Sequence, residues 1–357
     1  MKNDTIEISV IGAGIMGIMS AYYLQTSVPN SNITLYDPAG FPADNASYIA
    51  GGMIAPLSEL DHMPETYLQA GYESINLWDN ISQTLGNDFE FSAQGSLFIS
   101  HDEDRHLLER FKSILPQNDD WQTIGSHDIT TLEPTLKTQT FKNGLYMKRE
   151  AHLHPQKVMQ TLLKQIQNKE QIAIDIRKEA KKADLVIDCR GMNAQDQDKN
   201  IRGVKGEVLI VRNPEFTLSR PLRLMHPRYP LYIVPRENNI FLIGATIIET
   251  NNNKNVSLRS GMELMSALYS IHRSFGDAEI IEMKANARPS YPDNLPQIHK
   301  DQNIIRCNGL YRHGFLFSPV LAQCVARHIN GKSDPFKHLF WKGHKDEHHS
   351  KRQRAYA

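Results

Sequence analysis

The amino-terminal part of the chain joins two apolar runs through closely spaced glycines. Residues 6–11, "IEISVI", are rich in Ile and Val, and "IMGIMSAYYL" continues with apolar side chains at the spacing of a buried helix. A second strand-like run, "SNITLYD", ends at Asp37. The pattern predicts a strand, a glycine turn, a helix and a second strand in immediate succession.

The glycines of this turn have the spacing of a dinucleotide-binding motif. Gly12 permits the tight turn, Gly14 lets the backbone approach a pyrophosphate, and Gly17 lets the helix pack close to the strand. The N-terminus of the helix presents free N–H groups to phosphate. Asp37 ends the second strand, where a carboxylate can accept hydrogen bonds from a ribose hydroxyl. The motif predicts a bound dinucleotide, and by itself it leaves NAD and FAD open.

Later segments return to the same sheet. Short apolar runs at 172–176 and 183–188 predict two more buried strands, so the nucleotide-binding domain is expected to be discontinuous in sequence. Residues 303–331 predict a strand, a glycine-containing turn and a helix that rejoin this domain. Ser318 and Pro319 have the residue types of an N-cap and a first helical position.

The pattern changes from residue 205 onwards. Strand-like runs alternate with turn residues, and residues 236–239 are expected to join two strands as a hairpin. Residues 258–275 have helical spacing. The apolar side of that helix is expected to consist of Met262, Leu264, Met265, Leu268 and Ile271. These elements predict an antiparallel sheet covered by a helix, which is an α+β arrangement.

Composition excludes several classes of function. Forty basic residues balance forty acidic ones, so nothing favours a nucleic-acid partner. No uninterrupted apolar run reaches the length of about 18 residues that a membrane span needs. The amino terminus lacks the basic start and apolar centre of a signal peptide. We therefore expect a soluble cytoplasmic protein.

Metal binding is not expected. Cys189, Cys307 and Cys324 are too widely spaced for a metal motif or a disulfide framework, and two of them follow apolar runs, which is typical of buried thiols. His344 and the pair at 348–349 lie in a terminus rich in Lys and Arg. A solvated, frayed end is the favoured interpretation of that terminus.

Eight segments occur together in the order seen in one protein family. They are "VIGAGIMG", "ASYIAGGMIAP", "EAHLHPQKV", "RGVKGEVLIV", "YPLYIVPR", "IGATIIE", "ARPSYPDNLP" and "NGLYRHGFLFSP". The chain thereby resembles the FAD-dependent amine oxidases of the D-amino-acid oxidase family, and within them the glycine oxidases of thiamine biosynthesis. The resemblance extends over residues 6–340, and its last two motifs are the most specific.

The resemblance implies a fold of class α/β + α+β, with a Rossmann-type FAD-binding domain and a second, antiparallel-sheet substrate domain. The expected division gives the FAD-binding domain residues 1–80, 145–203 and 300–340, the substrate domain residues 81–144 and 204–299, and a C-terminal tail residues 341–357.

The resemblance also implies which residues contact FAD. Asp37 takes the place of a glutamate found in much of the family at the adenosine ribose. His313 is expected to act through its backbone in the turn beside the flavin. The full set of expected cofactor-binding residues is Gly12, Gly14, Ile15, Met16, Gly17, Asp37, Ala46, Ser47, Gly51, Gly52, Met53, Gly191, Leu310, Tyr311, Arg312, His313, Gly314, Phe315 and Leu316.

A substrate site follows from the same resemblance. Arg288 corresponds to the arginine that pairs with the substrate carboxylate, a contact suited to the planar fork of a guanidinium. Tyr232 corresponds to a tyrosine that borders the substrate, and Arg312 lies beside the flavin turn. Met53 and Ile247 correspond to pocket walls, although the family often has methionine at the latter position.

The implied activity is oxidative deamination of glycine or a similarly small amino acid, giving an imine and then glyoxylate and ammonia. Dioxygen would be the acceptor and hydrogen peroxide a product, and the imine would serve thiazole synthesis in thiamine biosynthesis. The alternatives are a D-amino-acid or sarcosine oxidase or dehydrogenase, a flavoprotein partner with little turnover, and, from the first motif alone, an NAD-linked dehydrogenase. Family members are often oligomeric, so a homo-oligomer is a further expectation.

Overall fold

The structure is a computed structural model of the 357-residue chain. It describes residues 5–41, 45–136, 140–168, 172–176, 182–227, 231–252 and 255–342. The three clustered histidines of the C-terminal tail lie outside the described residues.

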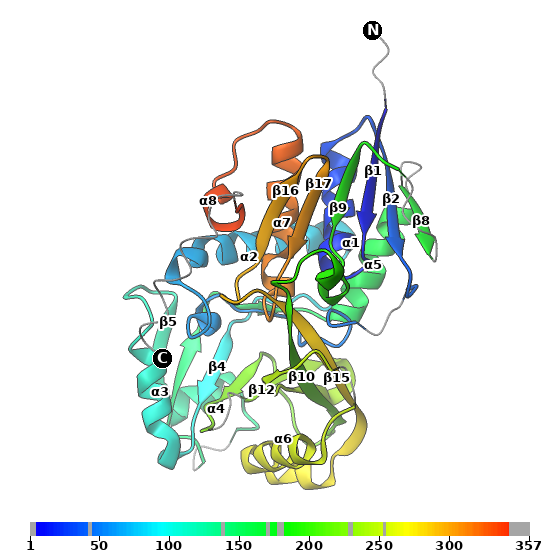
Figure 1. The fold of residues 1–357 in the computed structure, drawn as a ribbon. Coiled ribbons are helices and arrows are strands. Elements are labelled where there is room, and N and C mark those ends of the chain that lie inside the picture. Colours follow the sequence, from blue (N-terminus) through cyan, green and yellow to red (C-terminus); the bar gives the residue numbers. More distant parts are fainter. Residues whose placement is uncertain are drawn as a thin grey trace.

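A six-stranded sheet forms the upper part of the molecule in Figure 1. Its strands, in spatial order, are β16 (Gln297–Asp301), β17 (Ile304–Asn308), β9 (Leu185–Asp188), β1 (Ile6–Ile11), β2 (Ser31–Asp37) and β8 (Ile172–Ile176). All neighbouring pairs are parallel except β16 and β17. The prediction that the sheet resumes near residue 170 and is rejoined by the last strand is therefore confirmed.

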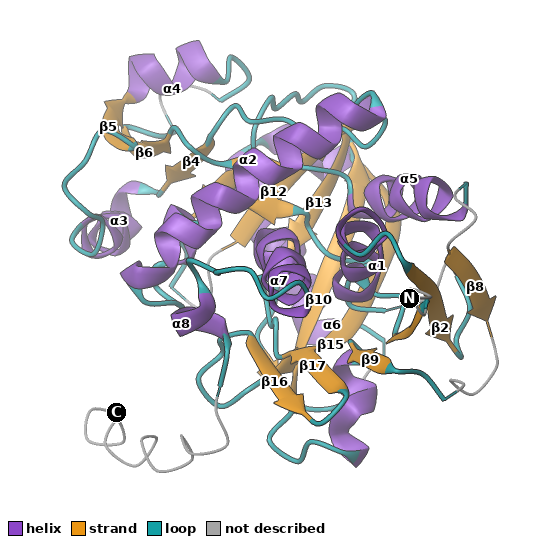
Figure 2. Cartoon of the chain, turned by 90° about the horizontal axis from the view of Figure 1, so that it is seen from above, coloured by secondary structure: helices purple, strands orange, loops and turns teal. Residues whose placement is uncertain are grey.

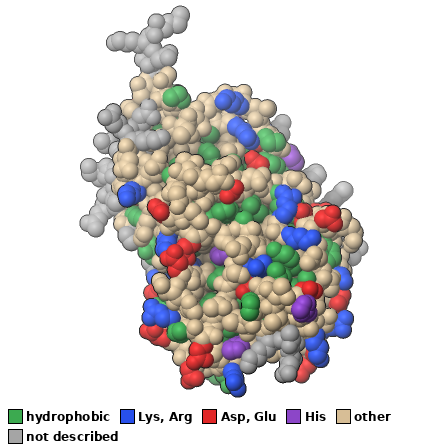
Figure 3. Space-filling view, turned by 180° about the vertical axis from the view of Figure 1, so that it is seen from behind, with side chains coloured by type: hydrophobic (Ala, Val, Ile, Leu, Met, Phe, Trp, Pro, Cys, Tyr) green, Lys and Arg blue, Asp and Glu red, His purple; other side chains and the backbone are tan. Residues whose placement is uncertain are grey.

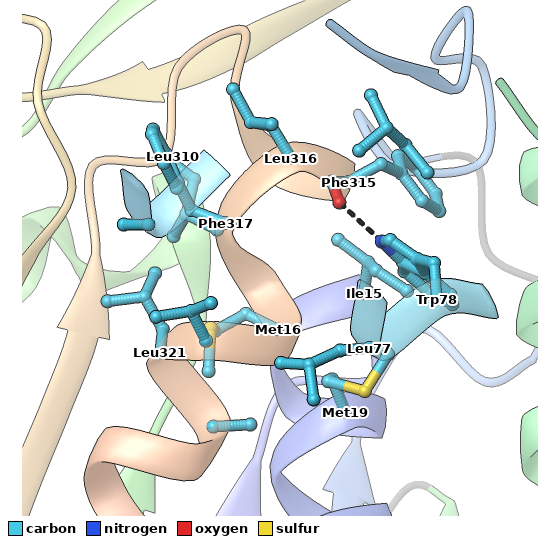
Figure 4. Close-up of a cluster of buried hydrophobic side chains, with 14 of the residues drawn as sticks. Ile15, Met16, Met19, Leu77, Trp78, Leu310, Phe315, Leu316, Phe317 and Leu321 are labelled. Carbon is cyan, nitrogen blue, oxygen red and sulfur yellow. Dashed lines mark hydrogen bonds between the residues drawn. The ribbon is translucent and has the colours of Figure 1, made fainter. Parts of the chain in front are cut away.

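The main helices of this part of the chain lie on one side of the sheet (Figure 2). They are α1 (Ile15–Ser27), α2 (Leu68–Leu85), α5 (Pro155–Gln167) and α7 (Gly314–Ile329). Helix α7 packs against both α1 and α2, as the view from above shows (Figure 2). Their shared apolar cluster joins Met16 and Met19 of α1 to Leu77 of α2 and Leu321 of α7 (Figure 4). Segments from opposite ends of the sequence thus form one core.

Helix α7 begins one turn earlier than the sequence predicts. Its first residue is Gly314, so Ser318 and Pro319 are not the N-cap and first position but lie inside the helix. A proline has no N–H to donate to the carbonyl four residues before it, which here belongs to Phe315. The indole Nε1 of Trp78 donates to that oxygen instead, at 2.8 Å (Figure 4). Because the vacated acceptor is satisfied from α2, the helix extends past its proline.

A nine-stranded, largely antiparallel sheet forms the second layer. Its main path is β14 (Ile248–Glu249), β10 (Arg202–Arg212), β13 (Ile240–Gly244), β12 (Leu231–Arg236), β11 (Leu222–Leu224), β4 (Ser96–Ile99), β6 (Asn143–Met147) and β5 (Trp121–Gly125), and β15 (Glu279–Ser290) pairs with β10. The predicted hairpin is confirmed, with a single 3-10 turn at Glu237–Asn239 between β12 and β13.

Helix α6 (Leu258–Ile271) packs against this sheet and confirms the predicted covering helix. It buries Leu264, Leu268 and Ile271 as expected. The side chain of Met262, however, is 58% exposed, so its assignment to the apolar side is wrong. Two residues turn a helix through about 200°, which places position 262 on the far side from position 264.

The chain has further short elements. Among them are α3 (Arg105–Lys112), α4 (Ser126–Leu132), α8 (Lys337–Phe340), and the two-stranded sheet of β3 (Met53–Ile54) and β7 (Ala151–His152). The division of the chain into domains stays a prediction. Strand β6, which spans the expected boundary at residue 145, pairs with β4 and β5 in the nine-stranded sheet.

The surface carries both signs of charge. Acidic and basic side chains are interspersed on the face seen in Figure 3, in keeping with forty residues of each kind. Within the described ranges, no helix has the length and apolar character to cross a membrane.

Candidate active site

A cavity of about 520 Å³ lies where the carboxyl ends of the parallel strands meet the nine-stranded sheet. Ligands of open parallel sheets bind at this edge, because the turns that follow the strands converge there. The residues expected from the sequence that line the cavity are Gly12, Gly14, Ile15, Met16, Asp37, Ala46, Ser47, Gly51, Gly52, Met53, Gly191, Tyr232, Arg288 and residues 310–316. Their individual roles stay predictions.

Two expected residues are not in the cavity wall. Gly17 faces β1: a Cβ built on it would lie 1.8 Å from the carbonyl oxygen of Gly12, so it permits close packing of helix on strand. Ile247 is 38% exposed and does not line the cavity. The preceding Thr246 is buried and hydrogen-bonded to Glu207, so this segment packs on β10 outside the wall.

The glycine turn has the backbone geometry that the sequence predicts. Gly12 has φ +101°, a conformation that side chains disfavour, and a Cβ there would meet the carbonyl oxygen of Cys189 at 2.6 Å. Ser47 binds the start of α1, since its hydroxyl accepts a hydrogen bond from the N–H of Ile15 at 3.1 Å. The loop of residues 45–52 is thereby attached to the helix N-terminus that opens the cavity.

Asp37 lies at the end of β2 and borders the cavity. Its Oδ2 accepts from the N–H of Ala13 at 2.7 Å, and its Oδ1 accepts from the N–H of Ala39 at 2.9 Å. Each carboxylate oxygen has a further lone pair available. These two bonds fix the carboxylate between the glycine turn and the loop after β2, where it can accept from a hydroxyl.

Arg288 enters the opposite end of the cavity from β15. Its guanidinium Nη1 donates to the backbone carbonyl of Thr246 at 3.2 Å. Among the described residues no carboxylate lies within ion-pair distance of it. Burial lowers the pKa of Arg288, and the nearby charge of Arg312 acts in the same direction. A carboxylate ligand would relieve both effects.

Glycines make room for the two side chains that project into this end. A Cβ on Gly206 would lie 2.1 Å from Nη2 of Arg288, and a Cβ on Gly244 would lie 2.7 Å from the hydroxyl of Tyr232. Gly51 lies on the other side of the Tyr232 ring, where a Cβ would approach it to 3.1 Å. Sequence reasoning missed the first two glycines, although a glycine inside a strand is a known signal of close approach.

Sequence reasoning also missed Glu59, which lines the cavity. Its Oε1 pairs with Nη2 of Arg312 at 3.1 Å, and its Oε2 lies 3.2 Å from Nε2 of His313. Burial opposes ionisation, yet Arg312 and the hydrogen bond with His313 hold the pKa of Glu59 well below its usual range. The imidazole of His313 is therefore part of the site as well as its backbone. In the sequence, a glutamate within "PLSEL" carries no pattern that would single it out.

The turn that bears Glu59 is held by buried polar groups. Both the N–H and the hydroxyl of Ser58 donate to Glu150, each at 2.7 Å. Arg223 donates to the carbonyl of Ser58 and pairs with Asp61 at 3.0 Å. Burial raises the pKa of Glu150 to about 7, although its hydrogen bonds with Ser58 and a further serine act against this. These contacts leave the Glu59 backbone little freedom to move.

The strand–glycine–helix turn, the acid at the end of the second strand and the cavity beside them define a dinucleotide-dependent oxidoreductase. The chain belongs to the family of FAD dependent oxidoreductases (DAO), whose family model matches residues 7–328. It is accordingly a flavoenzyme with FAD as its cofactor.

Individual relatives agree with this assignment. The chain is 36% identical over 326 residues to a protein of Rhizobium etli assigned as the thiamine biosynthesis oxidoreductase ThiO, covering 91% of this chain and 96% of that one. Glycine oxidase of Geobacillus kaustophilus is 30% identical over 37% of this chain and 35% of its own length. In structure, a glycine oxidase from the same species gives a TM-score of 0.83 at 19% identity, over 95% of this chain and 100% of that chain. An FAD-bound L-α-glycerophosphate oxidase of Mycoplasma pneumoniae gives a TM-score of 0.73 at 18% identity, over 91% of this chain and 94% of that chain.

The cavity fits FAD. Glycines line the wall where a flat or phosphate-bearing ligand needs room, at positions 12, 14 and 51. The α1 N-terminus would hold the pyrophosphate, and Asp37 would accept from the ribose. The first turn of α7 also lines the cavity, so its positive dipole would stabilise negative charge on a reduced flavin.

Proposed function

We propose that the protein catalyses oxidative deamination of glycine or a similarly small amino acid. The amine gives an imine, which water converts to glyoxylate and ammonia in the case of glycine, while dioxygen is reduced to hydrogen peroxide. The imine would be used for thiazole formation in thiamine biosynthesis. The observation that supports this most directly is Arg288, a cavity arginine for which the described residues provide no carboxylate.

Arg288 would bind the substrate carboxylate. Its guanidinium keeps Nη2 and Nε available, since only Nη1 donates to a described acceptor, the carbonyl of Thr246. Two parallel charge-assisted bonds to a carboxylate would then fix the direction of the α-carbon. Orientation of this kind is a large part of catalysis when the cofactor carries the chemistry.

The remaining residues shape the site. The Tyr232 ring, confined between Gly51 and Gly244, borders the space beside Arg288 and limits the size of the substrate side chain. Bound FAD would supply the two-electron acceptor and the route to dioxygen. The activity of the relatives named above supports a small amino acid as the substrate.

Anaerobic reduction of the bound flavin tests the proposal. Purified protein is mixed with glycine, sarcosine, D-alanine and D-aspartate, and loss of flavin absorbance is followed without oxygen. We expect bleaching by the smallest amines and, in air, about one peroxide per amine consumed. Bleaching without peroxide would indicate a dehydrogenase.

Arg288→Lys tests whether the guanidinium binds the substrate carboxylate. A lysine keeps the charge but loses the bidentate geometry, so kcat/KM should fall by about tenfold to a hundredfold with flavin content unchanged. A flavin that none of these amines reduces in the wild type would overturn the proposal.

A further inference from the structure

Two arginines line the substrate end of the cavity, and they differ in whether an acid neutralises them. Arg312 is paired with Glu59 at 3.1 Å, whereas Arg288 has only a backbone carbonyl. Their chain segments are directly bonded, because the N–H of Tyr311 donates to the carbonyl of Pro289 at 2.8 Å. The wall therefore presents two neighbouring cations, one of which already holds a carboxylate of the protein itself.

The internal carboxylate is fixed in place. Glu59 is only 12% exposed at its side chain, and both of its oxygens are engaged, one by Arg312 and one by His313. The preceding residue, Ser58, is bonded through its N–H, hydroxyl and carbonyl to the buried Glu150 and Arg223. A side chain held from both ends does not readily leave Arg312 to an incoming ligand.

We propose that Glu59 determines substrate specificity by occupying Arg312, so that the enzyme accepts amines with one carboxylate and rejects those with two. The proposal rests on the proposed function, because it assumes that Arg288 binds the substrate carboxylate. A second carboxylate on the same small molecule would reach the neighbouring cation and meet the charge of Glu59 there. Like charges placed together in this way disfavour a ligand strongly.

Removing the charge of Glu59 should therefore create a second carboxylate site. In Glu59→Gln the amide keeps the size of the side chain and its hydrogen-bonding capacity, but Arg312 is no longer neutralised. A dicarboxylate could then pair with Arg288 and Arg312 together. Iminodiacetate, which is glycine extended by one carboxymethyl group, is the corresponding amine.

Equilibrium binding to the FAD-loaded protein gives the primary test. The Kd values of acetate and malonate are measured by calorimetry and by perturbation of the flavin spectrum in the wild type and in Glu59→Gln. We expect the preference for malonate over acetate to increase by at least about tenfold in the variant. Anaerobic flavin reduction should show the same change for iminodiacetate relative to glycine.

Two further variants separate this role from a structural one. Glu279→Gln removes an acid from a surface pair with Arg212 and should leave the ratio unchanged. Glu59→Gln combined with Arg312→Gln should lose the gained preference, because the second cation is absent. If Glu59→Gln does not fold, Arg312→Gln alone provides the converse test. The charge of Glu59 is then no longer neutralised by Arg312, and the Kd of malonate should rise at least about tenfold more than the Kd of acetate.

An unchanged ratio in folded, flavin-loaded Glu59→Gln would overturn the proposal. An equal rise in the Kd values of malonate and acetate in Arg312→Gln would also overturn it. The binding measurement requires no turnover. If no amine reduces the flavin, the proposed function fails, and the ratio of Kd values still decides the role of Glu59.

Discussion

At the scale of single residues, the substrate end of the cavity depends on two glycines whose lack of a side chain leaves room for their neighbours. Strand β10 carries Gly206 against the guanidinium of Arg288, and β13 ends at Gly244, which is paired with Tyr232. A methyl group at either position would occupy the volume of a side chain that is expected to contact the substrate. The glycines thus position the polar groups without contacting a ligand themselves.

Gly206→Ala is expected to displace the Arg288 guanidinium, since the new Cβ would lie 2.1 Å from Nη2. Losing one hydrogen bond to a charged group costs about 1.5–3 kcal/mol, so KM for the amine and Kd for acetate should rise by tenfold or more. Gly125→Ala is the matched control, because its Cβ would have no neighbour nearer than 4.0 Å. Equal values in the two variants would show that Gly206 has no such role.

The parts of the site that were predictable from the sequence are those with local signatures. The turn around Gly12 and the acid at position 37 depend on backbone geometry within one strand–helix–strand unit, which leaves a recognisable spacing. Arg288 and Tyr232 could be nominated only through family resemblance. Glu59 was missed because its partners are about 250 residues away in sequence, and no local pattern reports such a pairing.

At the scale of elements, helix α7 shows how a tertiary contact can override a local rule. Proline favours the first turn of a helix, which is why the sequence places the start at residues 318–319. The start at Gly314 depends on a donor from α2, and this donor is far away in sequence. The extra turn brings residues 314–316 to the cavity wall.

Trp78→Phe tests this dependence. The variant keeps an aromatic ring in the core but leaves the carbonyl of Phe315 without its donor, so the free energy of unfolding should fall by about 1–3 kcal/mol in urea titrations. Adding Pro319→Ala restores a backbone N–H to that carbonyl and should recover part of the loss. Strictly additive effects of the two substitutions would contradict the assignment.

The contribution of Glu150, which holds Ser58 beside Glu59, to the stability of the fold is expected to depend on pH. Burial raises the pKa of Glu150 to about 7 from its ordinary 4.5, so between these values the folded chain holds a proton that the unfolded chain has released. The contribution of this residue to stability therefore falls as pH rises from about 4.5 to about 7.

Glu150→Gln removes this titration. Relative to the wild type, the variant should become more stable by about 1–3 kcal/mol as the pH increases from 4.5 to 8, measured by urea unfolding at each pH. The comparison cancels the opposite trend expected from His152, a histidine whose pKa burial lowers to about 4. A difference between variant and wild type that is independent of pH would contradict the expectation.

At the scale of the whole molecule, the cavity joins the two sheets. Its walls come from the turns after β1, β2 and β9 on one side and from β10, β12 and β15 on the other. Short apolar runs and strand-like runs separated by turn residues allowed both sheets to be predicted from sequence. Their junction was not predictable in the same way, because it consists of contacts between segments that share no periodic pattern.

A ligand that fills this junction should stabilise the folded chain. For FAD at about a hundred times its Kd, the gain is about 2.7 kcal/mol, so the melting temperature of FAD-depleted protein should rise with FAD concentration. NAD at the same concentrations is the control and should produce no comparable shift. Equal stabilisation by both would contradict the assignment of FAD as the cofactor.

The order of the strands also bears on how the protein is made. Strand β17 lies between β9 and β16, and the first turn of α7 completes the cavity wall, with Gly314 beside Ile15 of the amino-terminal glycine turn. During synthesis on the ribosome, the amino-terminal half of the cofactor site emerges early but has nothing to close it. The binding site for the flavin is therefore completed only after Leu316 has been translated and has left the exit tunnel. We expect FAD to bind late in the synthesis of each molecule or after it.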